Sequence, residues 1–211
     1  MTTNRACDIC ESVEEKVFNF LCQYQADLIS NAKDRAVHFE RGGFCAFHTW
    51  QYNQMTSVRA ACSSHSDFLQ LLGDKLLALA MEPGSLEQLV HKLEQFPANH
   101  PDCIVCEVAA QEEKDALGAA LDNLNSDPGA DETPPLYCFP HLAALAAKCA
   151  DPPKVRRLVE RHGEEFRRVA EEMRQYAAKQ DARRRDLLTN RESAASFLGL
   201  MLLAGRSRPG S

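Results

Sequence analysis

The sequences CDIC at residues 7–10 and CAFH at residues 45–48 form a pair of motifs that the chain contains twice. The second pair is CIVC at residues 103–106 and CFPH at residues 138–141. In both pairs a CxxC motif precedes a CxxH motif, with 34 residues between them in the first pair and 31 in the second. Acidic, helix-forming sequence follows each CxxC, and an aromatic residue precedes each CxxH. The pattern indicates an internal duplication with a period of about 95 residues.

Each pair of motifs supplies three cysteines and one histidine, a donor set that is typical of structural zinc. Two residues between ligands place both side chains on one side of a helical turn or of a tight knuckle. All four motifs are expected at or just before helix starts, where the helix dipole helps to hold cysteines as thiolates. The sequence therefore predicts two metal sites. The predicted ligands are Cys7, Cys10, Cys45, His48, Cys103, Cys106, Cys138 and His141.

The identity of the metal is predicted less directly than the ligands. Zinc, as two ions per chain, is preferred because four protein ligands close each site and leave no position for water. An iron–sulfur cluster is the alternative, since clusters bind sets of cysteines and accept histidine. A transferable metal is a third possibility. Buried thiols without any metal are the plain structural interpretation, which the repeated spacing disfavours.

The reach of the chain allows each CxxC motif to share a site with the CxxH motif of its own half. Residues 125–137, if extended, span up to about 43 Å and could return Cys138 to the helix start at Cys106. In the first half, a short helix before Gly42 and Gly43 would make the return. Crossed pairing, with the CxxC of one half and the CxxH of the other in one site, stays open.

The composition bounds the class of protein. Apolar residues make up 45% of the chain and charged residues 26%, which is typical of a globular protein. Nine cysteines without an N-terminal apolar signal segment predict a cytoplasmic protein, because disulfides are uncommon in reducing compartments. The net charge is −12 over residues 1–153 and +6 over residues 154–211, and an acidic body disfavours nucleic-acid binding. No apolar run reaches the roughly 18 residues that a membrane span needs.

Helical periodicity without alternating strand patterns predicts an all-α fold. The expected architecture is a helical bundle of two similar halves, each with a Cys3His metal site, plus a long C-terminal helix. The first half covers residues 1–96, the second covers 97–153, and residues 154–211 hold the long helix and an apolar terminal segment, all within one compact unit. Helices are predicted over residues 11–30, 34–41, 46–61, 66–82, 85–96 (with Ser85 as its cap), 104–124, 139–150 and 154–188.

The long C-terminal helix carries an apolar seam with alternating steps of four and three residues. The seam residues are Val155, Val159, His162, Phe166, Val169, Met173 and Tyr176. We interpret the seam as part of the core, or alternatively as the interface of a homodimer. The terminal segment SFLGLMLLAG at residues 196–205 is too short to span a bilayer and is expected to cap the bundle or to offer a partner patch.

Several cysteines and histidines lie outside the four motifs. Cys22, Cys62 and Cys149 are interpreted as small buried residues, although Cys62 and His65 form a third CxxH without a CxxC partner. The remaining histidines are interpreted as ordinary packed, surface or loop residues, and the one before Pro101 could alternatively orient a metal ligand. These histidines are His38, His91, His100 and His162.

The motif sequences ACDIC, GGFCAFH, CIVC and CFPHL, followed by a charged helix that ends in an apolar segment, resemble an uncharacterised bacterial family. Its members are all-helical domains with paired CxxC and CxxH motifs. The resemblance covers nearly the whole chain and carries over the eight motif residues as matching positions. It implies the fold and the metal-binding motifs, and it implies no established activity.

No catalytic motif accompanies the metal motifs. The chain lacks a nucleophile elbow, a phosphate-binding loop, a dinucleotide fingerprint and an HExxH motif, so no catalytic or cofactor-binding residue is predicted. The preferred hypothesis is a non-enzymatic, zinc-binding scaffold or adaptor that acts through contacts with a protein partner. One alternative is an iron–sulfur protein for redox chemistry, electron transfer or cluster delivery. Another is a thiol-based redox switch.

Overall fold

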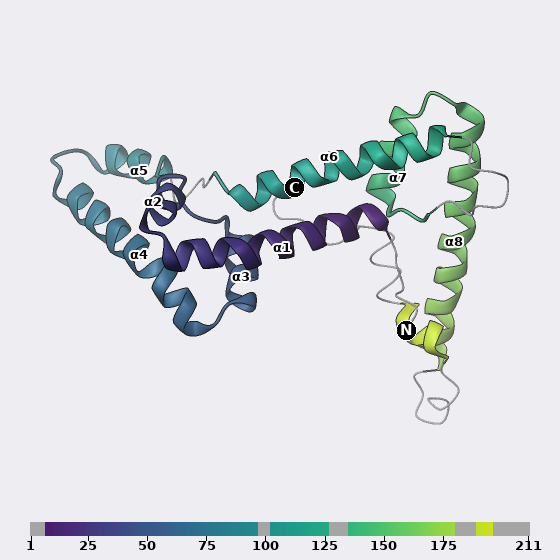
Figure 1. Cartoon of the computed structure of the whole chain (residues 1–211), viewed down its shortest axis with the longest axis horizontal. Helices are drawn as coiled ribbons and strands as arrows, with labels where there is room; N and C mark the ends of the chain where they lie inside the picture. The colour runs from purple at the N-terminus through teal and green to yellow at the C-terminus, as the bar shows by residue number, and fades with distance from the viewer. Residues whose placement is uncertain (1–6, 97–101, 127–134, 180–188, 196–211) are drawn as a thin grey trace. The chain divides into compact units, whose positions relative to one another are not determined.

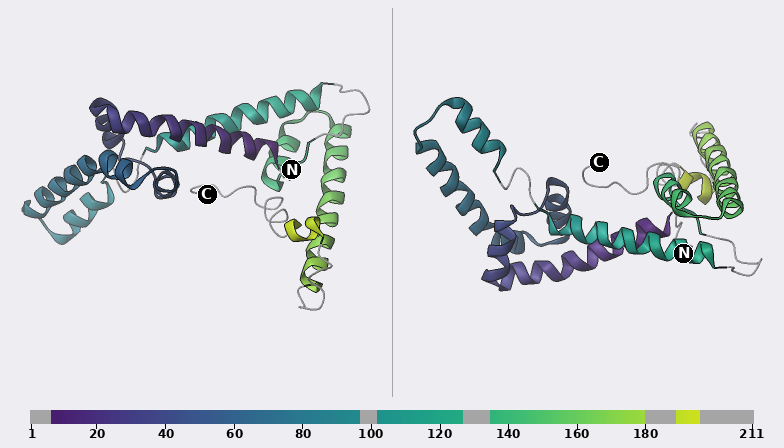
Figure 2. Two further views of the ribbon diagram at one scale, coloured as in Figure 1. Left: turned by 60° about the horizontal axis from the view of Figure 1, so that its bottom comes forward. Right: turned by 90° about the horizontal axis from the view of Figure 1, so that it is seen from above.

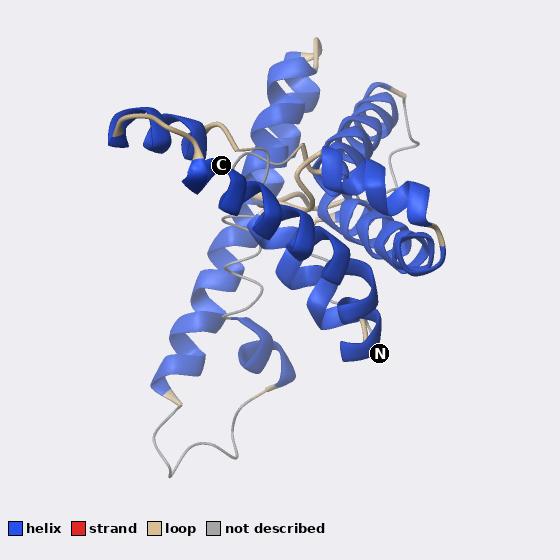
Figure 3. Cartoon of the chain, turned by 90° about the vertical axis from the view of Figure 1, so that its left-hand side faces the viewer, coloured by secondary structure: helices blue, strands red, loops and turns tan. Residues whose placement is uncertain are grey.

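The computed structural model describes residues 7–96, 102–126, 135–179 and 189–195. Every regular element within these ranges is a helix and none is a strand, which confirms the all-α class (Figure 3). The helices labelled in Figure 1 are α1 (Asp8–Ser30), α2 (Ala32–Glu40), α3 (Ala46–Met55), α4 (Val58–Met81), α5 (Leu86–Glu94), α6 (Ile104–Asn125), α7 (Phe139–Lys148) and α8 (Pro152–Ala178), and a short helical segment covers residues 190–195. None of these helices is both long and apolar enough to cross a membrane.

The end of α2 depends on two glycines. Gly42 and Gly43 have φ angles of 82° and 84°, in the left-handed region that side chains disfavour. The N–H of Gly43 donates to the carbonyl of His38, which closes the end of the helix. A Cβ atom at Gly43 would lie 2.9 Å from the ring of Phe68, so packing and backbone conformation both require glycine. The turn brings the chain directly to Cys45.

The helix predicted over residues 46–61 is interrupted in the structure. α3 ends at Met55, and α4 begins at Val58 after Ser57, whose side chain accepts a hydrogen bond from the N–H of Ala60. One helix, α4, then covers both the end of the predicted segment and the segment predicted over 66–82. The cap predicted at Ser85 is confirmed, and Gln88 completes a reciprocal capping box with it.

The chain forms two compact units that alternate along the sequence. Unit 1 contains residues 1–14 and 111–208, and unit 2 contains residues 15–110 and 209–211. The boundaries fall inside α1 and α6, so each of these helices has its CxxC motif in one unit and its later turns in the other. This division differs from the sequential one into residues 1–96, 97–153 and 154–211, because each unit combines a CxxC motif with the CxxH motif of the other half.

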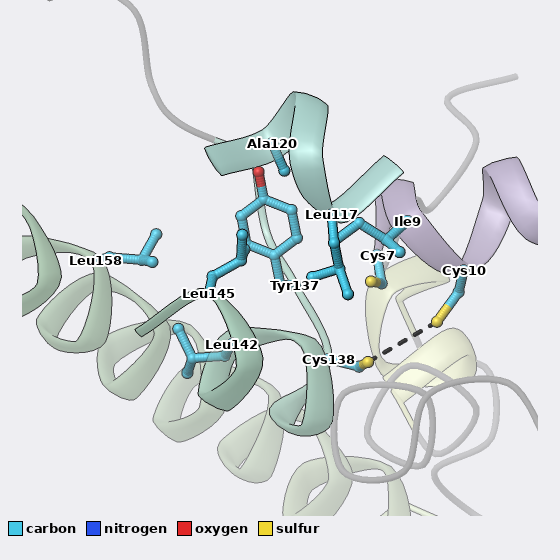
Figure 4. Close-up of a cluster of buried hydrophobic side chains, with 10 residues drawn as sticks. All are labelled: Cys7, Ile9, Cys10, Leu117, Ala120, Tyr137, Cys138, Leu142, Leu145 and Leu158. Atoms are coloured by element: carbon cyan, nitrogen blue, oxygen red, sulfur yellow. Dashed lines mark hydrogen bonds between the residues drawn. The ribbon is translucent and has the colours of Figure 1, made fainter. Parts of the chain in front are cut away.

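The core of unit 1 surrounds α7 and includes three of the cysteines. Figure 4 shows Cys7 and Cys10 of α1 facing Cys138, with apolar side chains of α6 and α7 beside them. The buried cluster consists of Cys7, Ile9, Cys10, Leu117, Ala120, Tyr137, Cys138, Leu142, Leu145 and Leu158. The metal-binding motifs of this unit are therefore part of its hydrophobic core rather than of a surface loop.

Only some of the seam residues of α8 are buried in unit 1. His162 and Val169 are buried, as is Leu158 beside the seam, whereas Val159 and Met173 are exposed. The helix begins at Pro152, with Asp151 as its cap, and ends at Ala178. Residues 180–188, predicted as its continuation, and the apolar segment at 196–205 lie outside the described residues.

The core of unit 2 is rich in aromatic rings. His38 is 1% exposed and lies 4.4 Å from Phe44 between ring centroids, with Tyr24 and Phe68 as further neighbours. Burial lowers the pKa of His38 to about 4, so the ring is neutral at pH 7. Its Nδ1 atom lies 3.4 Å from the hydroxyl of Tyr24.

Helices α4 and α5 of unit 2 form a hairpin (Figure 2). Lys92 of α5 pairs with Glu82 at the end of α4. None of the α5 side chains is buried. The most exposed apolar residues of the hairpin, all 67–86% exposed, are Val58, Leu69, Leu77, Met81 and Leu86. The hairpin therefore exposes apolar side chains that are not buried between its own two helices.

Candidate metal centres

The first cluster of metal-binding side chains, called site 1, lies in unit 1. It consists of Cys7, Cys10, Cys138 and His141, all buried, with their donor atoms within 4.8 Å of one another. The Sγ atoms of Cys10 and Cys138 are 3.8 Å apart, the pair joined by a dashed line in Figure 4. Nδ1 of His141 lies 3.2 Å from Sγ of Cys7, 3.5 Å from Sγ of Cys10 and 3.2 Å from Sγ of Cys138.

The second cluster, called site 2, lies in unit 2 and repeats this arrangement. It consists of Cys45, His48, Cys103 and Cys106. The Sγ atoms of Cys45 and Cys106 are 3.8 Å apart. Nδ1 of His48 lies 3.2 Å from Sγ of Cys45 and 3.4 Å from the sulfurs of both Cys103 and Cys106. All eight predicted ligands thus fall into two clusters of three cysteines and one histidine.

Both sites pair motifs from different halves of the sequence. The CxxC of α1 shares site 1 with the CxxH of α7, and the CxxC of α6 shares site 2 with the CxxH of α3. The expected return of Cys138 to Cys106 is therefore wrong, and the crossed alternative is the one observed. Chain reach permitted both arrangements, and the tertiary packing of α1 and α6 decided between them.

The spacing of the donor atoms fits one tetrahedral ion in each site. Bonds of about 2.3 Å to sulfur and about 2.0 Å to nitrogen place two sulfurs about 3.8 Å apart, and sulfur about 3.5 Å from nitrogen. The sulfur–sulfur distances given above are 3.8 Å in both sites, and the sulfur–nitrogen distances are 3.2–3.5 Å. Each cluster can therefore hold a metal ion without rearrangement of its side chains.

The two CxxH turns have the same local geometry. Cys45 and Cys138 are the residues that precede α3 and α7, with φ and ψ of −63° and 162° at Cys45 and of −67° and 160° at Cys138. Neither side chain caps its helix by a hydrogen bond, so both sulfurs are available to the site. The histidine three residues later lies on the first helical turn and faces the same point.

A carboxylate supports the histidine of site 1 from behind. Nε2 of His141 lies 3.0 Å from Oε1 of Glu113 on α6, while Nδ1 faces the cysteines. A carboxylate in this position fixes the tautomer of a ligating histidine and orients its ring. The neighbouring Glu112 has a different role, since it accepts a hydrogen bond of 2.6 Å from the hydroxyl of Ser12 on α1.

Hydrogen bonds within site 1 shift the pKa values of its cysteines and of its histidine. Hydrogen bonds with Cys10 and Cys138 lower the pKa of Cys7, whereas hydrogen bonds with Cys10 and Cys7 raise the pKa of Cys138. Burial alone would lower the pKa of His141, but its hydrogen bonds to Cys10 and Cys7 outweigh burial and raise the pKa to about 10. A bound divalent ion would compete with the proton of the imidazole and would stabilise thiolates in the cluster.

Site 2 has a basic side chain beside its CxxC motif. Arg41 donates to the backbone carbonyl of Asp102 at 3.0 Å and forms ion pairs with the carboxylates of Asp102 and Glu107. These residues flank Cys103 and Cys106, so Arg41 ties the end of α2 to the start of α6. Burial raises the pKa of Cys106 to about 12, and the charge of Cys103 adds to this effect.

His162 supports the CxxH turn of site 1. The backbone N–H of Tyr137, directly before Cys138, donates to Nε2 of His162 at 2.8 Å. Nδ1 of His162 donates to the carbonyl of Leu158 at 2.7 Å, which assigns the tautomer. The rings of Tyr137 and His162 stack with centroids 5.9 Å apart. His162 is therefore a packed residue, as expected, with a specific structural role that the sequence did not indicate.

The other cysteines do not extend either site. Among the described residues, no further group of three or more metal-binding side chains is present. Cys62 is exposed, and Cys22 and Cys149 are partly exposed, so the prediction that these three are buried is wrong for Cys62. His65 contacts the hydroxyl of Ser64 at 2.8 Å. His100 lies outside the described residues.

Comparisons with protein-family models, with curated proteins and with solved structures found no significant match to this chain. The family resemblance inferred from the motif sequences therefore stays a prediction, and the function is argued from the two sites alone.

Proposed function

We propose that this protein is a zinc-binding helical scaffold that acts as a non-enzymatic adaptor, with one zinc ion in each of its two Cys3His sites. The observation that carries the proposal is that eight donor atoms form two separate groups of four, each within 4.8 Å and each with one sulfur–sulfur distance of 3.8 Å that matches a tetrahedral edge. Three sulfurs and one imidazole nitrogen are a standard structural zinc set. Sites of this kind hold chain segments together rather than binding substrate.

The geometry favours a single ion over an iron–sulfur cluster in each site. A cluster distributes its protein ligands over two or more irons, so ligands on different irons lie farther apart than one tetrahedral edge. All four donor atoms of each site lie within 4.8 Å of one another, which suits ligands that share one ion. The cluster-carrier and electron-transfer alternatives would therefore require the ligands of both sites to move apart.

The proposed role of the ions is to fix connections between segments that are distant in sequence. Site 1 joins residues separated by up to 134 positions, and site 2 joins residues separated by up to 61. Four protein ligands leave no coordination position for a substrate, which supports a structural rather than a catalytic role. Zinc binding and folding should consequently be strongly coupled.

Contacts with another protein are proposed for the hairpin of α4 and α5. Leu77, Met81 and Leu86 are each at least 67% exposed on this hairpin, and apolar surface of this kind commonly marks a binding site. A second copy of the chain could bind to this hairpin and form a dimer. The exposed seam residues Val159 and Met173 of α8 offer a second surface for dimerisation. Light scattering of the purified protein would determine whether a dimer forms.

The proposal is tested by purifying the protein under reducing, oxygen-free conditions and measuring zinc and iron per chain beside a visible spectrum. We expect two zinc ions per chain, no colour, and loss of cooperative folding when a strong chelator removes the metal. Cys138→Ser should reduce the content to one ion, whereas Cys62→Ser, at an exposed cysteine outside both sites, should leave it at two. Iron with sulfide would replace the proposal by a redox function. Folded protein without metal would overturn it.

A further inference from the structure

The two sites have the same donors but different access to solvent. In site 1 all four ligands are buried, and the most exposed of them, Cys10, is 7% exposed. In site 2 only Cys103 and His48 are buried, while Cys45 and Cys106 are partly exposed. These two partly exposed cysteines, one at the start of α3 and one on α6, form one sulfur–sulfur edge of the site. Site 2 can therefore be approached from solvent along one edge, and site 1 cannot.

The residues around site 2 also restrain it less than the residues around site 1 restrain that site. Site 1 lies in the apolar cluster of unit 1, and Glu113 supports its histidine. Among the described residues, no acidic side chain is hydrogen-bonded to His48 in the corresponding way. The start of α6 is instead held by Arg41, whose partners Asp102 and Glu107 have side chains that are 68% and 56% exposed. Exposed ion pairs contribute modestly to stability, so they restrain the CxxC of site 2 less than burial restrains that of site 1, and their removal should loosen site 2 alone.

From this asymmetry we infer that site 2 is an exchange site, which takes up and releases its metal ion through the edge formed by Cys45 and Cys106, while site 1 releases its ion much more slowly. The inference rests on the proposed function in that both sites must bind metal. The acceptor is a small or protein-borne ligand with thiolate or amine donors, because such donors match the preference of the ion and can reach a partly exposed edge.

The exchange follows from what the residues of site 2 can do. Two donor atoms of the acceptor would form bonds to the ion as its bonds to Cys45 and Cys106 break, and each released thiolate would take one proton from solvent. Two further donor atoms would then replace the buried Cys103 and His48, with one more proton taken up by the Cys103 thiolate and none by the neutral imidazole. No electrons are transferred, so the ion would keep its charge of two.

The exchange is tested on the full, metal-loaded chain with a colour-forming chelator and an alkylating reagent under oxygen-free conditions. We expect one equivalent of metal to leave in a fast phase and the second in a separate slow phase. Mass spectrometry should show Cys45 and Cys106 alkylated at least about tenfold faster than Cys7, Cys10 and Cys138, because thiol reactivity follows exposure. Arg41→Ala should accelerate the fast phase alone, whereas Arg59→Ala, at an exposed arginine of the same unit, should change neither phase.

Two outcomes separate this inference from the function on which it rests. If two ions are bound but leave in one phase, or if the cysteines of site 1 are alkylated first, the exchange role of site 2 is overturned while the scaffold remains. If the protein contains no metal at either site after incubation with metal and removal of the excess, the proposed function itself fails.

Discussion

Cys10 and Cys138 are 128 positions apart in the sequence, yet their Sγ atoms lie 3.8 Å apart in one buried cluster. Cys45 and Cys106 form the corresponding pair of site 2 at the same distance. Both pairs join a CxxC motif to the CxxH motif of the other half. The crossed pairing is thus a property of both sites and gives rise to a simple genetic test.

Double serine variants should distinguish crossed from sequential pairing. Cys10→Ser with Cys138→Ser damages only site 1, so we expect one metal ion per chain to remain. Cys10→Ser with Cys45→Ser damages both sites, and we expect no tightly bound ion. Metal analysis after dialysis against a weak chelator makes the measurement. Sequential pairing would give the opposite result, with one ion in the second variant and none in the first.

Removing the carboxylate behind His141 should weaken site 1 without changing its ligands. Glu113→Ala deletes the partner of Nε2, and loss of such a partner reduces metal affinity by about 10- to 100-fold. Glu113→Gln keeps an oxygen that can accept the hydrogen bond and should have a smaller effect. Competition with a chelator of known affinity provides the measurement. Glu112→Ala, at the adjacent position, serves as the control, and an equal loss there would contradict the assigned role.

Substitution of His162 should destabilise unit 1 through the backbone of the CxxH turn. His162→Leu leaves the buried N–H of Tyr137 without its acceptor, which typically costs about 1–3 kcal/mol. Urea unfolding of the metal-loaded protein measures the change in the free energy of unfolding. His162→Gln restores an acceptor and should recover part of the loss. An unchanged midpoint for the leucine variant would show that the hydrogen bond contributes nothing.

His38 should make the stability depend on pH between about 6.5 and about 4. Its pKa in the folded protein is about 4, below the ordinary value of 6.5, because burial disfavours the charged ring. The unfolded chain therefore binds the proton first, and stability that is fully present above pH 6.5 is lost as the pH falls toward 4. The loss approaches about 3 kcal/mol.

The measurement compares the free energy of unfolding of the wild type and of His38→Phe at each pH. Acid also protonates the thiolates of both sites in each protein, so only the difference between the two reports on His38. That difference should shift by about 3 kcal/mol in favour of the variant between pH 6.5 and pH 4. His91→Phe, at an exposed histidine of α5, is the control and should follow the wild type. A constant difference across this range would contradict the assignment.

The sequence singled out the eight residues that the structure gathers into two clusters, because the spacing within each motif is local. Two residues between ligands define a turn whatever the rest of the chain does, so the donor sets could be identified directly. The pairing of motifs depends on where α1 and α6 pack, and both pairings were within reach of the chain. The interruption at Ser57 was missed because helix-forming sequence lies on both sides of it, whereas Pro83 and Gly84 marked the cap at Ser85 clearly.

The supporting residues could not be predicted for a different reason. Glu113 is one of several acidic residues on α6, and only the tertiary structure places it, rather than Glu112, behind His141. Arg41 acts on residues 61 and 66 positions away. Such contacts have no local pattern, so a single sequence contains no sign of them.

The crossed pairing also imposes an order on assembly, because the residues of site 2 lie within the stretch of chain that site 1 closes. Site 2, the inner site, has all its ligands once residue 106 has been synthesised, whereas site 1, the outer site, needs residue 141. Once the inner site closes, the loop that the outer site must close shortens from 128 positions to roughly half. Halving a loop lowers the entropic cost of closing it by about 0.6 kcal/mol. If both sites bind metal as proposed, the ion that binds first would therefore help to recruit the second.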